Sequence, residues 1–271
     1  MILSFIEAFS YEFMRNALIV GICVSLCAAL LGVSLVLKKY SMLGDGLSHV
    51  GFGALAIATI IGVAPLAIAI PTVIIVAFLL LRVSNRSKTS GDALVAVISA
   101  TALAIGVFAM SISSGSNIDV YNYMFGSIVA VSKSDMIVTL VISIIVITLY
   151  VISYNNMFAI TFDETFAKTS GVRVEIYNSL LAILTSIIVV IGMKMMGALL
   201  ISSLVIFPSI SAMAVCKRYK SVVITSAIIS IVAFLVGLFF SYTLSTPCGA
   251  SVVIVNVIIL IACKIVAFVR R

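Results

Sequence analysis

Long apolar stretches recur along this chain of 271 residues, and they constrain its fold more than any other feature. Each has about 20 residues, the length at which an α-helix crosses the hydrocarbon core of a bilayer. The sequence predicts helical spans at residues 17–37, 45–62, 65–81, 92–112, 136–153, 177–193, 197–215, 221–242 and 249–268. Because some stretches are short, and the pair 45–62 and 65–81 could be irregular, we expect an all-α polytopic bundle of eight or nine transmembrane helices.

The composition excludes other classes of protein. Hydrophobic residues make up 63% of the chain and charged residues 9%, whereas a soluble domain has about 45–50% apolar and about 25% charged residues. Too few polar side chains remain to cover a water-facing surface, which excludes a soluble enzyme, a disordered chain and a nucleic-acid-binding module. We expect a single membrane domain over residues 1–271, with the lipid bilayer and not a nucleic acid as its surroundings.

Basic residues lie in short clusters between the apolar stretches, which is the pattern of cytoplasmic loops. These clusters are Lys38-Lys39, Arg82/Arg86/Lys88, Lys217-Arg218/Lys220 and Arg270-Arg271. With nine spans, they place the N-terminus outside the cell and the connection 154–175 in the cytoplasm. The connection 113–135 is then external, and its stretch Tyr121–Val131, which is too short to span, is predicted to be re-entrant or interfacial.

The connection 154–175 is the most polar part of the chain. Its stretch Thr161–Glu164 has the T-x-x-E pattern of a capping box, and Gly171 stands where a glycine would end the helix. We therefore predict a short cytoplasmic helix over about 162–170. Phe162 and Phe166 are four residues apart and would share one of its faces. Such a face requires cover, either from the membrane surface or from a cytoplasmic protein that docks on it.

Asp45 and His49 are the residues inside the spans that are most able to bind an ion or carry a proton. Ionisable groups in a membrane are costly and mark functional sites by default. His49 is the only histidine of the chain, and its spacing of four from Asp45 places both side chains on one helix face. A carboxylate and an imidazole together suit zinc, manganese or ferrous iron. A symmetric dimer could bring a second pair near its axis.

Two other interpretations of this pair remain open. Asp45 could cap the second span and hydrogen-bond to His49 without any metal. The pair could also relay protons, because histidine titrates near neutral pH. Elsewhere, Cys23 and Cys27 could bind a soft metal but are more typical of small packing residues, and Lys194 is expected to snorkel to the external interface.

Motifs for independent catalysis are absent from the sequence. No lysine follows a glycine, so the phosphate-binding pattern G-x-x-x-x-G-K-[ST] does not occur, and neither does G-x-S-x-G, H-E-x-x-H or C-x-x-C. Any use of ATP therefore requires another subunit.

Five segments together resemble the membrane permeases of zinc, manganese and iron ABC importers. Leu43–His49 resembles the family's G-D-x-L-S-H signature, and Gly197–Pro208 resembles its G-x-L-L-(V/I)-S-(A/S)-L-x-x-x-P span. Tyr123–Ile128 resembles the segment L-F-G-x-(I/L), Phe162–Gly171 the cytoplasmic loop D-x-x-x-A-x-x-x-G, and Pro247–Gly249 the motif P-x-G. Cys248 replaces the small or hydroxyl residue expected within the last motif.

The resemblance implies a homodimeric channel in the bacterial plasma membrane. Two cytoplasmic ATPase subunits would drive it, and an extracellular or periplasmic protein would deliver the metal. Asp45 and His49 would contact the ion in transit, and no cofactor would be bound permanently, since ATP binds to the partner subunit. The coupling helix that docks on the ATPase would include these residues: Phe162, Asp163, Glu164, Phe166, Ala167 and Gly171.

Two alternatives to an ABC importer follow from the residues. A secondary transporter driven by a proton or sodium gradient would use Asp45 and His49 as a proton relay and would work alone. It would not need a capped cytoplasmic helix with an exposed aromatic face. A membrane-embedded enzyme would need a nucleophile with its base, or a full set of metal ligands, and the sequence offers neither.

Overall fold

The computed structural model describes residues 10–84, 91–112, 124–126 and 131–270. Within these ranges nine helices are long and apolar enough to cross a membrane, so the expectation of eight or nine spans is confirmed at nine. They are α2 (Glu12–Leu37), α3 (Ser41–Ile61), α4 (Pro65–Ser84), α5 (Gly91–Ile112), α7 (Lys133–Ile152), α10 (Val174–Met196), α11 (Ala198–Val215), α12 (Tyr219–Leu244) and α13 (Cys248–Val269). Two short helices, α8 (Tyr154–Phe162) and α9 (Glu164–Thr169), connect α7 to α10.

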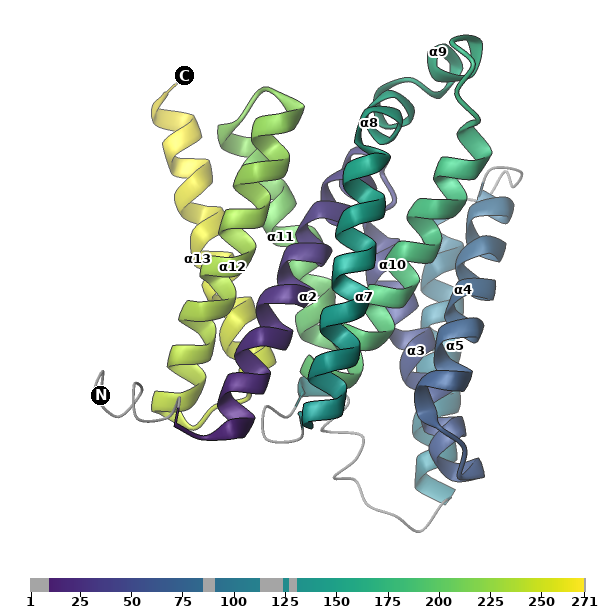
Figure 1. Cartoon of the computed structure of the whole chain (residues 1–271), viewed down its shortest axis with the longest axis vertical. Coiled ribbons are helices and arrows are strands. Elements are labelled where there is room, and N and C mark those ends of the chain that lie inside the picture. The colour runs from purple at the N-terminus through teal and green to yellow at the C-terminus, as the bar shows by residue number, and fades with distance from the viewer. Residues whose placement is uncertain (1–9, 85–90, 113–123, 127–130, 271) are drawn as a thin grey trace.

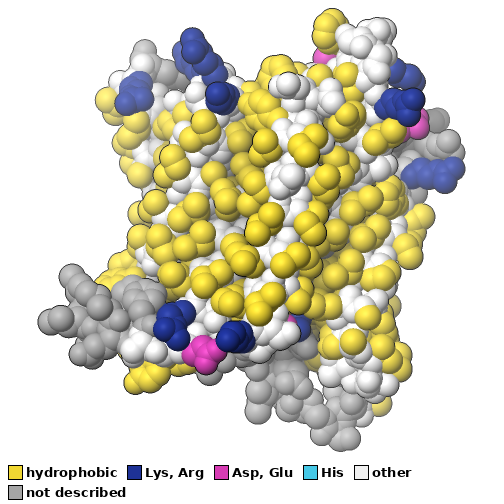
Figure 2. Space-filling model, viewed as in Figure 1, with side chains coloured by type: hydrophobic (Ala, Val, Ile, Leu, Met, Phe, Trp, Pro, Cys, Tyr) yellow, Lys and Arg dark blue, Asp and Glu magenta, His cyan; other side chains and the backbone are white. Residues whose placement is uncertain are grey.

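The long helices run up and down the bundle in alternation, and α8 and α9 extend beyond it at one end (Figure 1). Hydrophobic side chains cover the middle of the face in Figure 2, whereas Lys and Arg gather at its two ends, chiefly at the end that carries α8 and α9. By the positive-inside rule, that end is cytoplasmic. The helix α13 ends there, and α2 begins at the opposite, external end (Figure 1).

Burial differs sharply among the helices. Most residues of α2, α3 and α10 are buried inside the bundle, whereas α4, α5, α7 and α13 bury less than a quarter of theirs. The exposed side chains of α13 are almost all aliphatic or aromatic, as a lipid-facing surface requires. The helix α3 therefore stands largely within protein.

Close backbone contacts between glycines hold the external end together. Gly126 has φ +78° and Gly197 has φ +89°, conformations that side chains rarely adopt. A Cβ atom at Gly126 would lie 2.2 Å from the carbonyl oxygen of Met196, and one at Gly249 would lie 2.9 Å from that of Phe125. Three of the motif segments thus meet at one place. The remainder of the predicted re-entrant or interfacial segment, residues 121–123 and 127–130, lies outside the described residues.

Candidate functional site

Asp45 and His49 lie near the cytoplasmic start of α3. The helix begins at Ser41 and its N-cap is Tyr40, so the alternative interpretation in which Asp45 caps this span is wrong. The segment 41–44 continues the helix although it lacks the strong hydrophobicity by which the span was located. At a rise of 1.5 Å per residue, Asp45 lies about 6 Å and His49 about 12 Å along the helix.

The two side chains approach each other without a hydrogen bond. His49 Nε2 lies 3.8 Å from Asp45 Oδ2, a distance that permits electrostatic attraction but exceeds the length of a hydrogen bond. The Asp45 side chain is 41% exposed and that of His49 is 23% exposed. Both therefore keep most of their lone pairs available.

Neighbouring glycines define the direction in which Asp45 points. Gly44 packs on Val205 of α11, and Gly46 packs on Val95 of α5. Successive helical residues are about 100° apart, so Asp45 points outward between α11 and α5. This uncovered face lies within a membrane-spanning helix, where an ionisable pair requires protein or water and not lipid against it.

Hydroxyl groups line one side of this face. Ser48 Oγ donates a hydrogen bond to the carbonyl oxygen of Asp45 at 2.7 Å and lies 3.3 Å from Ser202 Oγ of α11. Among the described residues, no three His, Cys, Asp or Glu side chains come close enough together to hold a metal ion. A single chain thus brings a carboxylate and an imidazole to this face, and further ligands have to come from elsewhere.

The cytoplasmic segment is built differently from the predicted single helix. Asp163 has an extended backbone that ends α8, and its Oδ1 accepts a hydrogen bond from Phe166 N at 2.9 Å, which caps α9. Thr161 instead donates to the carbonyl oxygen of Met157 at 2.6 Å within α8. The predicted capping box is therefore wrong: Asp163, a more favourable N-cap residue than threonine, takes the role of Thr161.

Gly171 ends α9 as predicted. Its φ is +84°. Gly171 N donates to the carbonyl oxygen of Lys168 at 3.2 Å, and Val172 N donates to that of Ala167 at 2.9 Å. This pair of bonds is the Schellman motif, which satisfies the last carbonyl groups of a helix. The helix α9 is thus capped at both ends despite its six residues.

The two phenylalanines of this segment stand on different helices, because the chain breaks between them at Asp163. The prediction that they share one helical face is therefore wrong, but both rings are mostly exposed, at 61% for Phe162 and 65% for Phe166. The Phe162 ring lies 5.0 Å from that of Phe158 and 5.9 Å from that of Tyr219, measured between centroids. Phe166 extends from α9 at the tip of the molecule.

An open groove lies between α9 and the first turns of α10. Its volume is about 910 Å³. Charged side chains of both signs line it, namely Glu164, Lys168, Arg173 and Glu175. The exposed rings and this groove together form a surface with apolar and charged parts, which suits a protein partner more than a bilayer.

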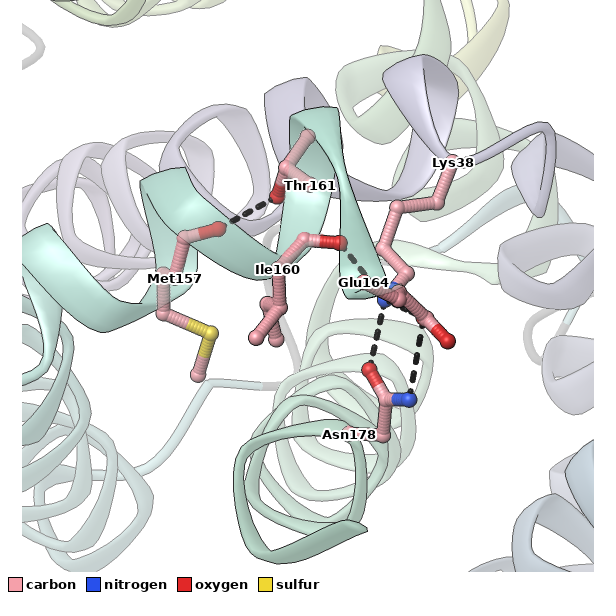
Figure 3. Close-up of polar contacts among 6 residues, drawn as sticks. All are labelled: Lys38, Met157, Ile160, Thr161, Glu164 and Asn178. Atoms are coloured by element: carbon pink, nitrogen blue, oxygen red, sulfur yellow. Dashed lines mark hydrogen bonds and ion pairs between the residues drawn. The ribbon is translucent and has the colours of Figure 1, made fainter. Parts of the chain in front are cut away.

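Lys38 joins this cytoplasmic segment to the bundle (Figure 3). Its Nζ donates to Glu164 Oε1 at 2.5 Å and to Asn178 Oδ1 at 2.6 Å. Burial raises the pKa of the Glu164 carboxyl, but the hydrogen bonds from Lys38 and Asn178 and the charge of Lys38 outweigh it and hold the pKa below its usual value. Sequence reasoning used Lys38 only as a topological signal, because nothing local indicates its partners.

Comparison with known proteins decides the family. Residues 10–267 match the model of the ABC 3 transport family. The chain belongs to the ABC 3 transport family. The resemblance drawn from the five sequence segments is thereby confirmed. As a member of this family, the chain is a transporter subunit and not an enzyme, and with nine candidate spans among its described residues it is a multi-pass protein of the plasma membrane.

Individual relatives match over nearly the full length of this ABC 3 chain. It is 27% identical to the manganese transport system membrane protein MntC of Halalkalibacterium halodurans, over 93% of this chain and 86% of that protein. It is 30% identical to the high-affinity zinc uptake system membrane protein ZnuB of Haemophilus influenzae, over 90% and 94%. The solved structure of PsaBC from Streptococcus pneumoniae in complex with Fab matches with a TM-score of 0.88 at 28% identity, over 97% of this chain and 95% of that chain.

Three other residues that the sequence of this ABC 3 chain singles out are Lys194, Cys27 and Cys248. Lys194, expected from the sequence to snorkel to the external interface, lies in the last turn of α10 with its Nζ 3.0 Å from Asp135 Oδ1 at the start of α7. Cys27 is fully buried, with Sγ 3.8 Å from the carbonyl oxygen of Ser143, as a small packing residue would be. Cys248 is 5% exposed at the beginning of α13.

Proposed function

We propose that the chain is the permease subunit of an ATP-driven importer of a divalent transition metal ion, with residues 1–271 forming one transmembrane domain. The carrying observation is the Asp45–His49 pair, which stands on an uncovered face of a membrane-spanning helix, 3.8 Å apart and partly exposed. Membership in a transport family supports this role. The names of its relatives, which refer to manganese and to zinc, support a metal substrate.

The chemistry of the pair limits the substrate to a class. A carboxylate prefers hard cations, and an imidazole shifts the preference toward zinc, manganese and ferrous iron. Two ligands from one chain bind such an ion weakly, which suits an ion in transit that must leave again. The metal is thus a transported substrate, and the proposal includes no resident cofactor.

A second copy of the chain would complete the pathway. Asp45 and His49 face outward between α5 and α11, and lipid against them would be unfavourable. A homodimer with its axis beside this face would bring two carboxylates and two imidazoles together, because a twofold interface pairs the same surface of both copies. This arrangement supplies up to four metal ligands from two copies of the same chain.

ATP hydrolysis would come from a separate cytoplasmic ATPase dimer, since the chain has no phosphate-binding pattern. We propose that α9 and the adjoining residues dock on it, with Phe162 and Phe166 as exposed apolar contacts and with Asp163, Glu164, Ala167 and Gly171 shaping the helix. An extracellular or periplasmic metal-binding protein would deliver the ion at the external end. Closure of the ATPases would then switch the side to which the pathway opens.

Cellular metal content tests this proposal. A host without its own importers would express the chain with its ATPase and binding protein, and mass spectrometry would measure manganese, zinc and iron. One metal should accumulate with the native chain and be lost with Asp45→Asn, with His49→Ala and with an inactive ATPase. Asp92→Asn, at the exposed start of α5, is the matched control and should leave accumulation unchanged. Accumulation that persists with the inactive ATPase would contradict the proposal and favour a secondary transporter.

A further inference from the structure

Lys38 lies where α2, α8, α9 and α10 meet, and it has no role in the transport cycle proposed above. It is the C-cap residue of α2, and its side chain is only 5% exposed. Its Nζ has three acceptors, which come from three different elements: the carbonyl oxygen of Ile160 in α8 at 3.4 Å, Glu164 in α9 and Asn178 in α10 (Figure 3). An ammonium group has three donors, so this set uses all of them.

Two of the three partners, Glu164 and Asn178, also bind each other. Asn178 Nδ2 donates to Glu164 Oε1 at 3.1 Å, which closes a triangle with the two bonds from Lys38. Glu164 is the first residue of α9, directly after the cap Asp163. The position of the docking helix is therefore defined by Lys38 on one side and by α10 on the other.

The near-complete burial of the Lys38 ammonium group distinguishes this connection from a surface ion pair. A surface ion pair contributes little, because water screens it and replaces its partners. The Lys38 side chain is shielded from water, and loss of the Glu164 carboxylate would leave its charge without compensation. The end of α2 and the start of α9 are consequently held to move together.

The chain continues from Lys38 directly to the candidate ion site. Lys39 has φ +61° and turns the chain, and Tyr40 N donates back to the carbonyl oxygen of Leu35 at 2.8 Å. The helix α3 begins at the next residue, and Asp45 stands in its second turn. A displacement of Lys38 thus reaches Asp45 through a short, hydrogen-bonded turn and one rigid helix.

We propose that Lys38 is a positioning residue that couples the docking helix α9 to the Asp45–His49 pair, so that its loss separates ATP hydrolysis from metal movement. This inference rests on the proposed function of the chain as an ATP-driven permease. It adds a residue that touches neither the ion nor the ATPase. The observation that carries it is the meeting of α2, α8, α9 and α10 at a single buried ammonium group.

The test compares two rates in one preparation. The complete complex of permease, ATPase and binding protein would be reconstituted in liposomes, and ATP hydrolysis and uptake of Mn²⁺ would be measured together. Lys38→Met keeps the length of the side chain and removes its charge. We expect it to retain ATPase binding and hydrolysis but to lower the metal taken up per ATP about tenfold, a factor typical of coupling between sites. Lys217→Met, the same change at an exposed residue of the cytoplasmic connection between α11 and α12, should leave this ratio unchanged.

The outcomes separate this inference from the proposed function. If Lys38→Met lowers hydrolysis and uptake by the same factor, Lys38 has only a structural role and the inference is wrong. If the native complex hydrolyses ATP but takes up none of the three metals, the proposed function itself fails, whatever Lys38 does. Should Lys38→Met not assemble, Asn178→Leu removes one corner of the triangle and leaves the charge pair in place. It should lower the same ratio, and an unchanged ratio would overturn the inference.

Discussion

The external and cytoplasmic ends of this permease are built on different principles. At the external end, the backbones at Gly126, Gly197 and Gly249 lie so close together that a Cβ atom would collide with them. At the cytoplasmic end, side chains make the connections, and α9 stands clear of the bundle with an exposed ring (Figure 1). Backbone packing permits few alternative arrangements, whereas polar side chains exchange partners readily. The comparison indicates that the external end depends on backbone crowding and the cytoplasmic end on contacts between side chains.

The largest expected effect is a loss of stability caused by a substitution at the external end. Gly197→Ala combines a positive φ with a Cβ atom 2.5 Å from Gly126 N, so we expect a loss of about 3 kcal/mol in stability from strain and overpacking. Thermal unfolding of the purified protein in detergent measures it. Gly171→Ala is the matched control, because Gly171 has φ +84° but nothing within 4 Å of its would-be Cβ. Equal effects of the two variants would refute the crowding argument.

The next effect concerns docking at the cytoplasmic end. The Phe166 side chain is 65% exposed, so Phe166→Glu should leave folding intact and weaken ATPase binding by about tenfold or more, as for a central aromatic contact. Co-purification of the ATPase with the permease measures this. Phe268→Glu, which changes an 81% exposed ring at the cytoplasmic end of α13, should retain the ATPase. Retention by Phe166→Glu as well would place docking elsewhere.

The smallest expected effect is on the pH dependence of stability, and it concerns the ion pair between Glu164 and Lys38. The pKa of Glu164 is lowered in the folded protein, so its contribution to stability is present above the unfolded pKa of about 4.3 and is lost as pH falls through the lower folded value. Because the side chain is 47% exposed, we expect this contribution to be below about 1 kcal/mol at pH 7.

Unfolding of Glu164→Gln at pH 7 and near pH 3 checks the sign. The variant should lose less stability than the native chain over this interval. A native and a Glu164→Gln protein with the same pH dependence would show that Lys38 does not stabilise the carboxylate.

The nine spans could be predicted because each depends on about 20 consecutive residues. The Asp45–His49 pair could also be predicted, since helical spacing alone brings the two side chains together. Local signals failed where two of them competed, as at Thr161 and Asp163, which are both good caps. Lys38 contacts Glu164, which is 126 positions further along the chain, and Asn178, which is 140 positions further. No pattern within one segment contains such information.

The central claim is that Asp45 and His49 contact the metal ion in transit. Electron paramagnetic resonance of Mn²⁺ bound to the reconstituted complex with an inactive ATPase tests it most directly. With the permease alone labelled with ¹⁵N, the account predicts a hyperfine coupling between the manganese and an imidazole ¹⁵N, lost with His49→Ala because this is the only histidine of the chain. A coupling that persists in His49→Ala, or bound Mn²⁺ without any nitrogen coupling in the native complex, would contradict it.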